Sequence, residues 1–306
     1  MKDLLITHTD LDGISPIILM NLTGINYEYK SIEIYDVDTT FEDLLKTDLN
    51  AYNNIFIVDL TIPKDIYEQL KEYNNVKVFD HHETHLYANE YPFAEVKVKE
   101  FGHLTCGTEL FYNYLVKQYK NLDTKLIRDY IEIVRQNDTW DWVDRDFASK
   151  VGALPFVYGK KDFIKSITKR LKKDKDKFEL TAFEKRYTKL QSAEMERYLK
   201  LKEKELKKYV INNYKVGIVF AENHKSELGN YLSAQNPDLD LIAIINNCEK
   251  ISYRTTRDDV RCNDFAAIYN GGGHQKASGS GMSEDDRLAI IKYYFKDVKE
   301  LENQEN

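Results

Sequence analysis

Apolar residues in the first third of the chain form short runs separated by polar stretches. Residues 4–6, 55–58 and 76–79 are rich in Leu, Ile, Val and Phe, which is typical of buried β-strands. Residues 31–35 predict a further strand, and residues 64–74 have the spacing of a crossover helix. Because strands alternate with helices, the pattern predicts an α/β domain with a mostly parallel sheet.

The pattern changes twice further along the chain. Residues 125–137 carry apolar side chains at helical intervals, and residues 160–210 are rich in Lys and Glu, poor in glycine and also helical in period. A second α/β pattern begins near Val216, with strand-like runs at residues 216–220, 241–245 and 251–254. The second pattern predicts a further α/β domain that follows a pair of helices.

The length of the chain favours two domains. A chain of 306 residues exceeds the size at which one hydrophobic core usually stops growing. We predict a catalytic α/β domain at residues 1–158, a helical linker at residues 159–212 and a smaller α/β domain at residues 213–306.

Composition narrows the classes of function. The net charge of −7 argues against a protein that binds long duplex or single-stranded nucleic acid, because such binding needs many Lys and Arg contacts with phosphate. A charged fraction of 31% and the lack of a long apolar run predict no membrane span. Cys106, Cys248 and Cys262 lack metal-site spacing, so we expect reduced thiols in a cytoplasmic protein.

Acidic and histidine side chains follow three predicted strands at the point where each strand ends. These segments are His8-x-Asp10-x-Asp12-Gly13, Asp59 and Asp80-His81-His82. The carboxyl ends of strands in open α/β sheets share one edge, where sites are built. Carboxylates at this density repel one another unless cations neutralise them. A His/Asp set without thiolate suits Mn²⁺ or Mg²⁺, so the sequence predicts a metalloenzyme.

A glycine-rich segment in the second domain forms another candidate site. Gly271, Gly272 and Gly273 would let backbone N–H groups approach an anionic phosphate, and His274 could donate to a phosphate oxygen. Arg254 ends a predicted strand and carries a guanidinium group suited to a terminal phosphate. Arg257 is a second candidate for the same role, with a plain salt bridge as the alternative.

Together these motifs resemble the DHH phosphoesterase superfamily, in the branch that carries a DHHA1 domain. The resemblance runs from residue 8 to residue 281 and rests on H-x-D-x-D-G, the strand-end Asp59, D-H-H and G-G-G-H-x-x-A-S-G. It implies a metal-binding DHH domain and a smaller substrate-binding DHHA1 domain, with the active site in the cleft between them. It also implies hydrolysis of phosphoester bonds with two Mn²⁺ ions, for which Mg²⁺ or Co²⁺ could substitute.

The same resemblance implies a role for each matching residue. The implied metal ligands are His8, Asp10, Asp12, Asp59, His81 and Asp138. Asp59 would bridge the two metals and be essential for catalysis, and Asp141 and Asp144 are alternatives to Asp138. His82 would face the substrate phosphate, whereas Asp80 would orient a neighbouring histidine without binding metal. Arg254 matches the substrate-binding arginine of the family.

The leading functional hypothesis is an oligoribonuclease ("nanoRNase") that releases mononucleotides from very short oligonucleotides. A RecJ-like nuclease for long strands would need an extra nucleic-acid-binding domain, for which this chain has no room. The alternatives are a phosphodiesterase for cyclic or linear dinucleotide signals, with or without phosphoadenosine-phosphate phosphatase activity, and an inactive nucleotide-sensing protein. We expect a monomer or a homodimer.

Overall fold

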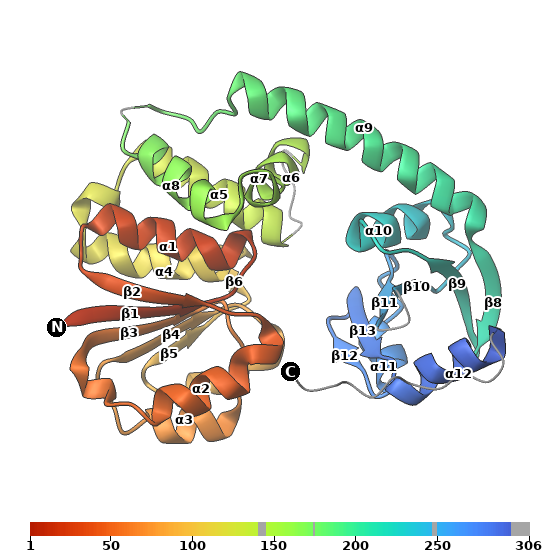
Figure 1. The fold of residues 1–306 in the computed structure, drawn as a ribbon, viewed down its shortest axis with the longest axis horizontal. Helices are drawn as coiled ribbons and strands as arrows, with labels where there is room; N and C mark the ends of the chain where they lie inside the picture. The colour runs from red at the N-terminus through yellow and green to blue at the C-terminus, as the bar shows by residue number, and fades with distance from the viewer. Residues whose placement is uncertain (140–144, 174, 247–249, 295–306) are drawn as a thin grey trace, which may run out of the picture. The chain divides into compact units, whose positions relative to one another are not determined.

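The computed structural model describes residues 1–139, 145–173, 175–246 and 250–294 (Figure 1). The chain forms two compact units, Met1–Thr188 and Lys189–Asn306, and the division falls within helix α9 (Ala182–Glu205). Among the described residues, no helix combines the length and the apolar character needed to cross a membrane.

The first unit is built on a five-stranded sheet in which every strand runs parallel to its neighbours. The strand order is β2 (Tyr27–Ser31), β1 (Lys2–Thr7), β3 (Tyr52–Val58), β4 (Val76–Asp80) and β5 (Ala94–Val96). The carboxyl ends of all these strands therefore lie at the same edge, and the predicted fold class is confirmed. The strand predicted at residues 31–35 lies earlier, at β2, because its partner β1 ends at Thr7, opposite Ser31.

Helices cover both faces of this sheet (Figure 1). One face carries α1 (Leu11–Thr23), α4 (Gly107–Gln118), α5 (Lys125–Thr139) and α8 (Lys160–Leu171), and the other carries α2 (Val37–Leu45) and α3 (Lys64–Leu70). Successive strand residues point to opposite faces of the sheet. Leu5 therefore packs into the first core, on the side of α1 and α4, while Leu4 and Ile6 pack into a second core of the same unit, on the side of α2 and α3. Shorter elements complete the unit: η1 (Ile34–Asp36), η2 (Leu49–Ala51), η3 (Glu83–Glu90), β6 (Lys99–Glu100), β7 (His103–Leu104), η4 (Lys120–Leu122), α6 (Arg145–Gly152) and α7 (Leu154–Tyr158).

Part of the segment predicted as a linker packs into the first unit. Phe163 and Ile167 of α8 are fully buried in the same core as Leu5, and Ile164 lies beside them. The division into residues 1–158, 159–212 and 213–306 stays a prediction, but α8 contributes to the first core rather than connecting two domains.

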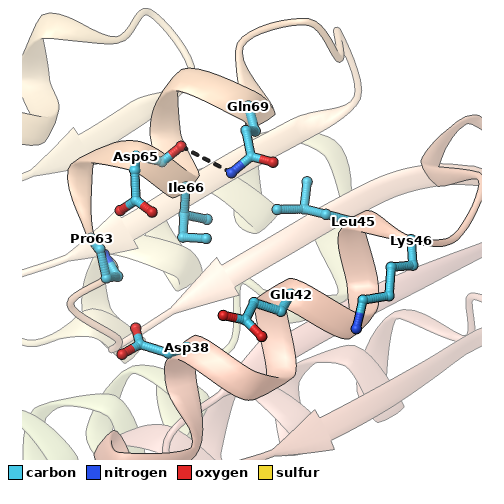
Figure 2. A pocket seen from close by; sticks show the side chains of 8 residues that line it. All are labelled: Asp38, Glu42, Leu45, Lys46, Pro63, Asp65, Ile66 and Gln69. Carbon is cyan, nitrogen blue, oxygen red and sulfur yellow. Dashed lines mark hydrogen bonds between the residues drawn. The ribbon is translucent and has the colours of Figure 1, made fainter.

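A groove of about 580 Å³ lies between α2 and α3 (Figure 2). Its walls carry three carboxylates, Asp38, Glu42 and Asp65, beside Ile66 and Lys46. None of the residues predicted to bind metal or substrate lines this groove.

The second unit contains a six-stranded mixed sheet. The strand order is β12 (Gly272–Gly273), β13 (Ala277–Gly281), β11 (Lys250–Arg254), β10 (Leu241–Asn246), β9 (Tyr214–Phe220) and β8 (Lys207–Ile211). Among the described strands of this sheet, only β9 and β10 pair in parallel, and helix α10 (Lys225–Gln235) connects them. Leu199 of α9 and Leu228 of α10 pack on one face of the sheet, while Phe265 of α11 (Cys262–Ala267) packs on the other. Helix α12 (Glu284–Tyr294) follows β13.

Candidate metal centre

The first helix begins directly against the end of the first strand. Asp10 is the N-cap of α1, and its Oδ1 accepts a hydrogen bond from the Gly13 amide at 2.9 Å. A Cβ at Gly13 would lie 2.3 Å from the carbonyl carbon of His8, so only glycine permits this close approach. The turn therefore brings His8, Asp10 and Asp12 to the carboxyl edge of the sheet.

Asp59 follows β3 in an unusual backbone conformation. Its φ angle is 57°, in the left-handed region that residues with a side chain adopt rarely, although Asp is among the more tolerant. The Asp59 amide donates to the carbonyl oxygen of Phe79 at 2.9 Å, and the residue is only 4% exposed. The neighbouring strand thus holds Asp59 in this conformation, which aims its carboxylate at the site.

The structure brings the predicted metal ligands together in two sets, and Asp59 and His81 also form a third set with Asp80 and His82. In each set, the potential ligand atoms all lie within 4.8 Å of one another. The first set is His8, Asp10 and Asp59, and the second is Asp12, His81 and Asp138. Asp141 and Asp144, the alternatives to Asp138, lie outside the described residues.

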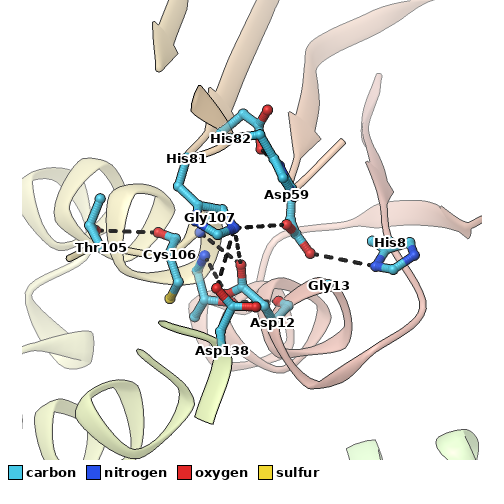
Figure 3. A network of polar contacts seen from close by, with 12 residues as sticks. His8, Asp12, Gly13, Asp59, His81, His82, Thr105, Cys106, Gly107 and Asp138 are labelled. Carbon is cyan, nitrogen blue, oxygen red and sulfur yellow. Dashed lines mark hydrogen bonds and ion pairs between the residues drawn. The ribbon is translucent and has the colours of Figure 1, made fainter. Parts of the chain in front are cut away.

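Asp59 lies between the two sets. Its Oδ2 is 3.8 Å from His8 Nδ1, while its Oδ1 is 3.5 Å from His81 Nε2 (Figure 3). His81 Nε2 is in turn 3.3 Å from Asp138 Oδ2. The two oxygens of one carboxylate therefore face different sets, which is the arrangement that a bridging ligand requires.

Buried charge is poorly neutralised at this site. Burial, together with the nearby Asp12 and Asp10 carboxylates, raises the pKa of both Asp59 and Asp138 well above the ordinary value. Burial also lowers the pKa of His81, which favours the neutral imidazole that metals bind. Within the described residues, the buried atoms Asp59 Oδ2, His81 Nε2 and Asp138 Oδ2 have no hydrogen-bond partner.

These observations fit divalent cations. Buried carboxylate oxygens and imidazole nitrogens without partners are costly unless a cation neutralises and coordinates them. Their oxygen and nitrogen chemistry suits Mn²⁺ or Mg²⁺. Cys106 is the cysteine nearest in sequence to the predicted metal ligands. It is a buried free cysteine, and burial raises the pKa of its thiol, so it does not offer a thiolate to a metal.

The N-terminus of α4 holds the Asp12 carboxylate, which sequence reasoning did not anticipate. The Gly107 amide donates to Asp12 Oδ2 at 2.7 Å, and the Thr108 amide donates to Asp12 Oδ1 at 2.9 Å. The Thr108 hydroxyl donates to the Asp12 backbone oxygen at 2.6 Å. A Cβ at Gly107 would lie 2.8 Å from Asp59 Cβ. These donors are backbone amides, which leave no side-chain signal in the sequence.

Asp80 contacts His82, which belongs to the third set, and His85, which belongs to none of the three. Its Oδ1 lies 2.8 Å from His82 Nδ1, and its Oδ2 lies 2.5 Å from His85 Nδ1. The Ile62 amide donates to His85 Nε2 at 3.3 Å, so the proton of His85 sits on Nδ1 and is donated to Asp80. Burial alone would raise the pKa of Asp80, but the hydrogen bonds from His82 and His85 lower it.

Two neighbours of the site carried no recognisable sequence signal. His85 lies outside the motifs, is completely buried and supports Asp80 through the contact of its Nδ1 with Asp80 Oδ2. Glu33 Oε2 lies 3.8 Å from His8 Nε2, and Glu33 Oε1 accepts a hydrogen bond from Thr9 at 2.6 Å. Only the folded chain brings the segments that carry His85 and Glu33 close to the site.

The predicted phosphate-binding residues lie in the second unit. Arg254 ends β11, and its Nη1 and Nη2 donate to the Tyr253 backbone oxygen at 2.9 Å and to Ser226 Oγ at 3.2 Å. Burial lowers the pKa of Arg254. Arg257 forms ion pairs with Asp240 at 3.0 Å and Asp259 at 2.6 Å, the alternative that the sequence left open.

Packing explains two of the three consecutive glycines. A Cβ at Gly271 would lie 2.2 Å from the Gly279 oxygen, and Gly273 has a φ of 131°. A Cβ at Gly272 would meet nothing within 4 Å. His274 is exposed, and its amide donates to the Ala277 oxygen at 2.8 Å. His274 therefore lies at the accessible turn between β12 and β13, and Gly272 lies exposed in β12, whereas Gly271 is fixed by its neighbours.

Comparisons with known proteins agree with the geometry. No family model matches the chain. The oligoribonuclease NrnB of Bacillus subtilis is 34% identical over 292 residues, which is 92% of this chain and 73% of that protein. The exonuclease RecJ bound to manganese has a similar fold, with a TM-score of 0.58 and 13% identity over 95% of this chain and 88% of RecJ. The pGpG-specific phosphodiesterase PggH of Vibrio cholerae has a TM-score of 0.53 and 12% identity over 96% of this chain and 97% of PggH.

The two kinds of comparison carry different weight. At 13% and 12% identity, RecJ and PggH support the fold alone. The similarity to NrnB extends over most of both chains, and the motifs H-x-D-x-D-G, Asp59 and D-H-H meet in one site of the first unit. The chain belongs to the DHH/DHHA1 phosphoesterase superfamily, in the family that includes NrnB.

Proposed function

We propose that this protein is a phosphodiesterase that hydrolyses very short oligonucleotides, including linear dinucleotides, to mononucleotides at a two-metal centre. The observation that carries the proposal is the convergence of two ligand sets on Asp59 in a chain related to the oligoribonuclease NrnB. That every ligand position implied by the resemblance is filled favours an enzyme over an inactive nucleotide sensor.

His8, Asp10 and Asp59 would hold one metal, and Asp12, His81 and Asp138 would hold the other, with Asp59 shared between them. When bound, a pair of divalent cations stabilises the charge that develops on the attacking and leaving oxygens of a phosphodiester. We propose Mn²⁺ for both positions, with Mg²⁺ or Co²⁺ as substitutes.

The protein's own residues orient the substrate phosphate. Burial alone would lower the pKa of His82, but its hydrogen bond with Asp80 and the Asp80 charge raise it, which favours the protonated imidazolium. Because Nδ1 is bonded to Asp80, Nε2 is the atom that would donate to a phosphate oxygen. Asp80 would act as a positioning residue, itself held by His85.

We further propose that the second unit binds another phosphate of the substrate. Arg254, Gly272 and His274 are the residues that would do so, with Gly271 and Gly273 shaping the turn. The ion pairs of Arg257 make Arg254 the stronger candidate. The cleft between the two domains, the domain boundaries and the oligomeric state stay predictions. The buried free thiols of Cys106 and Cys262 support a cytoplasmic location.

Substrate length provides the decisive test. The protein would be incubated with Mn²⁺ and labelled oligonucleotides of increasing length, alongside cyclic dinucleotides and phosphoadenosine phosphate, with products resolved over time. We expect the fastest turnover at about two to five nucleotides and a steep decline beyond roughly ten, because a chain with net charge −7 repels a longer strand. Salt should matter little for the shortest substrates, since few counterions are released.

Each other outcome of this test has a definite meaning. Equal or faster turnover of a strand of about 24 nucleotides, with the salt dependence of many phosphate contacts, would refute the short-substrate proposal. Activity confined to cyclic dinucleotides would favour the signalling alternative. Absence of hydrolysis with any substrate, in protein that binds Mn²⁺, would favour the nucleotide sensor.

A further inference from the structure

The hairpin of β6 and β7 has a turn that is unfavourable for its own sequence. Glu100 pairs with His103, so the turn consists of Phe101 and Gly102 alone. Their φ angles are 48° and 87°, both in the left-handed region, as in the type I′ turns that favour Asn, Asp or Gly at the first position. A bulky residue such as phenylalanine is a genuine outlier in this conformation.

The side chain of Phe101 adds a second unfavourable feature. It is 80% exposed, so its ring contributes little to either hydrophobic core. An exposed aromatic residue is unremarkable by itself. Here the exposed ring occupies a strained backbone position that a small polar residue would suit better. Such strain is often retained where it serves function.

The hairpin is anchored to the helices that build the metal centre. Arg135 of α5 donates to the Leu104 oxygen at 2.9 Å, and α5 continues to Asp138. His103 Nε2 lies 3.0 Å from Glu109 Oε1 in the first turn of α4, the helix that holds Asp12. Phe101 precedes Gly107 by six positions in the chain, so their Cα atoms lie within roughly 20 Å of each other.

We propose that Phe101 is a stacking platform for a nucleobase of the substrate. This inference rests on the proposed function and adds a source of affinity that phosphate contacts cannot provide. Phe101 lies 6.5 Å from the His103 ring, and the contact of His103 with Glu109 fixes the base of the hairpin. Stacking on one aromatic ring accepts every base, because every base has a π-face. The platform would therefore select nucleotides over other phosphodiesters without selecting a sequence.

Three substitutions at Phe101 distinguish the effect of the aromatic ring from the effect of the strained backbone. Phe101→Asn removes the ring and introduces a residue that the turn prefers. Phe101→Leu removes the aromatic ring but keeps an apolar side chain and the strained backbone. Phe101→Tyr keeps both the ring and the strain. We expect the Asn variant to melt at the same temperature as the wild type or higher, which would exclude misfolding as the cause of any loss.

With a dinucleotide substrate, KM should differ between the variants that keep an aromatic ring at position 101 and those that lose it. The Asn and Leu variants should raise KM by about tenfold or more while kcat stays within about twofold, whereas the Tyr variant should resemble the wild type. With an abasic dinucleotide, all four proteins should have the same KM. An unchanged KM for the intact dinucleotide in the Asn variant would overturn the proposal, as would an equal loss with the abasic substrate.

A binding measurement distinguishes failure of this inference from failure of the proposed function. In a Phe101→Trp variant, a non-hydrolysable dinucleotide should quench the added fluorescence relative to wild-type protein. If the wild type hydrolyses no dinucleotide but quenching occurs, the platform stands and the proposed activity falls. If the wild type is active and neither quenching nor a KM change is seen, Phe101 has no role in binding the base.

Discussion

Replacing Gly107 with alanine would perturb the metal centre without removing any predicted ligand. The new Cβ would lie 2.8 Å from Asp59 Cβ, 3.1 Å from Asp59 Cα and 3.1 Å from Asp12 Oδ2. Asp59 is held by its backbone hydrogen bond to Phe79 and cannot rotate out of contact, because the clash involves Cα and Cβ. If α4 moved instead, it would carry the two amides that bind Asp12. Either response displaces a ligand.

The expected cost to stability leaves the protein folded, so a loss of activity can be measured on folded protein. Overpacking of one methyl group typically destabilises a fold by about 1–3 kcal/mol, whereas alanine in place of helical glycine stabilises by roughly 1 kcal/mol. The metal-free protein should therefore lose about 0–2 kcal/mol and remain folded. A shift of a few tenths of an ångström in Asp12 or Asp59 weakens two-metal coordination, so we expect at least a tenfold decrease in turnover, or about 1.4 kcal/mol.

Two measurements would check this expectation. The first is Mn²⁺-dependent hydrolysis of a dinucleotide, and the second is the rise in melting temperature when Mn²⁺ is added. Tenfold weaker metal binding should reduce the metal-induced stabilisation by about 1.4 kcal/mol at saturating Mn²⁺. Gly281→Ala is the matched control, because a Cβ there would meet nothing within 4 Å. Wild-type turnover together with a wild-type metal response in Gly107→Ala would refute the proposed geometry of Asp12 and Asp59.

Three further predictions address the charges of the two candidate sites. Asp59→Asn should raise the melting temperature of the metal-free protein, because the raised pKa of Asp59 shows that its charge is unfavourable there, yet it should reduce turnover by about 100-fold or more. For the same reason, protonated Asp59 and Asp138 contribute to the stability of the metal-free protein below their ordinary pKa of 3.8. This contribution is lost as the pH rises through their raised pKa values. The Mn²⁺-induced rise in melting temperature should consequently grow as the pH rises above the ordinary carboxyl pKa, and a flat or falling response would contradict this interpretation. Arg254→Ala should raise KM by about tenfold or more without changing metal content, whereas an unchanged KM on every substrate would remove Arg254 from the phosphate pocket.

The location of the metal centre could be predicted from sequence because it depends on strand ends. A buried strand is visible as an apolar run, and a parallel sheet brings the carboxyl ends of its strands to one edge. His8, Asp59 and His81 each follow such a run, so their proximity was predictable without coordinates. Asp138 is different, because it comes from the end of a helix and its assignment depended on resemblance to the family.

The supporting contacts could not be predicted in the same way. The amides of Gly107 and Thr108 bind Asp12 across more than ninety residues of chain, and backbone donors have no side-chain signature. His85 reaches Asp80 from a 3₁₀ segment whose path a hydrophobic pattern does not reveal. Gly271 stays a predicted phosphate contact, but its close approach to Gly279 is a separate reason for glycine that the sequence did not reveal.

The difference between ligands and supporting contacts also explains how the fold can tolerate its own active site. The proposed metal ligands include like charges in a buried environment and a backbone angle at Asp59 that disfavours most residues. These features make the metal-free centre unfavourable, so they persist only because the surrounding structure holds them. Strands β1, β3 and β4 supply that support through completely buried residues such as Ile6, Ile57 and Val78. Removing a ligand should therefore leave a folded protein without activity, whereas replacing one of these core residues should destabilise the fold before it changes the chemistry.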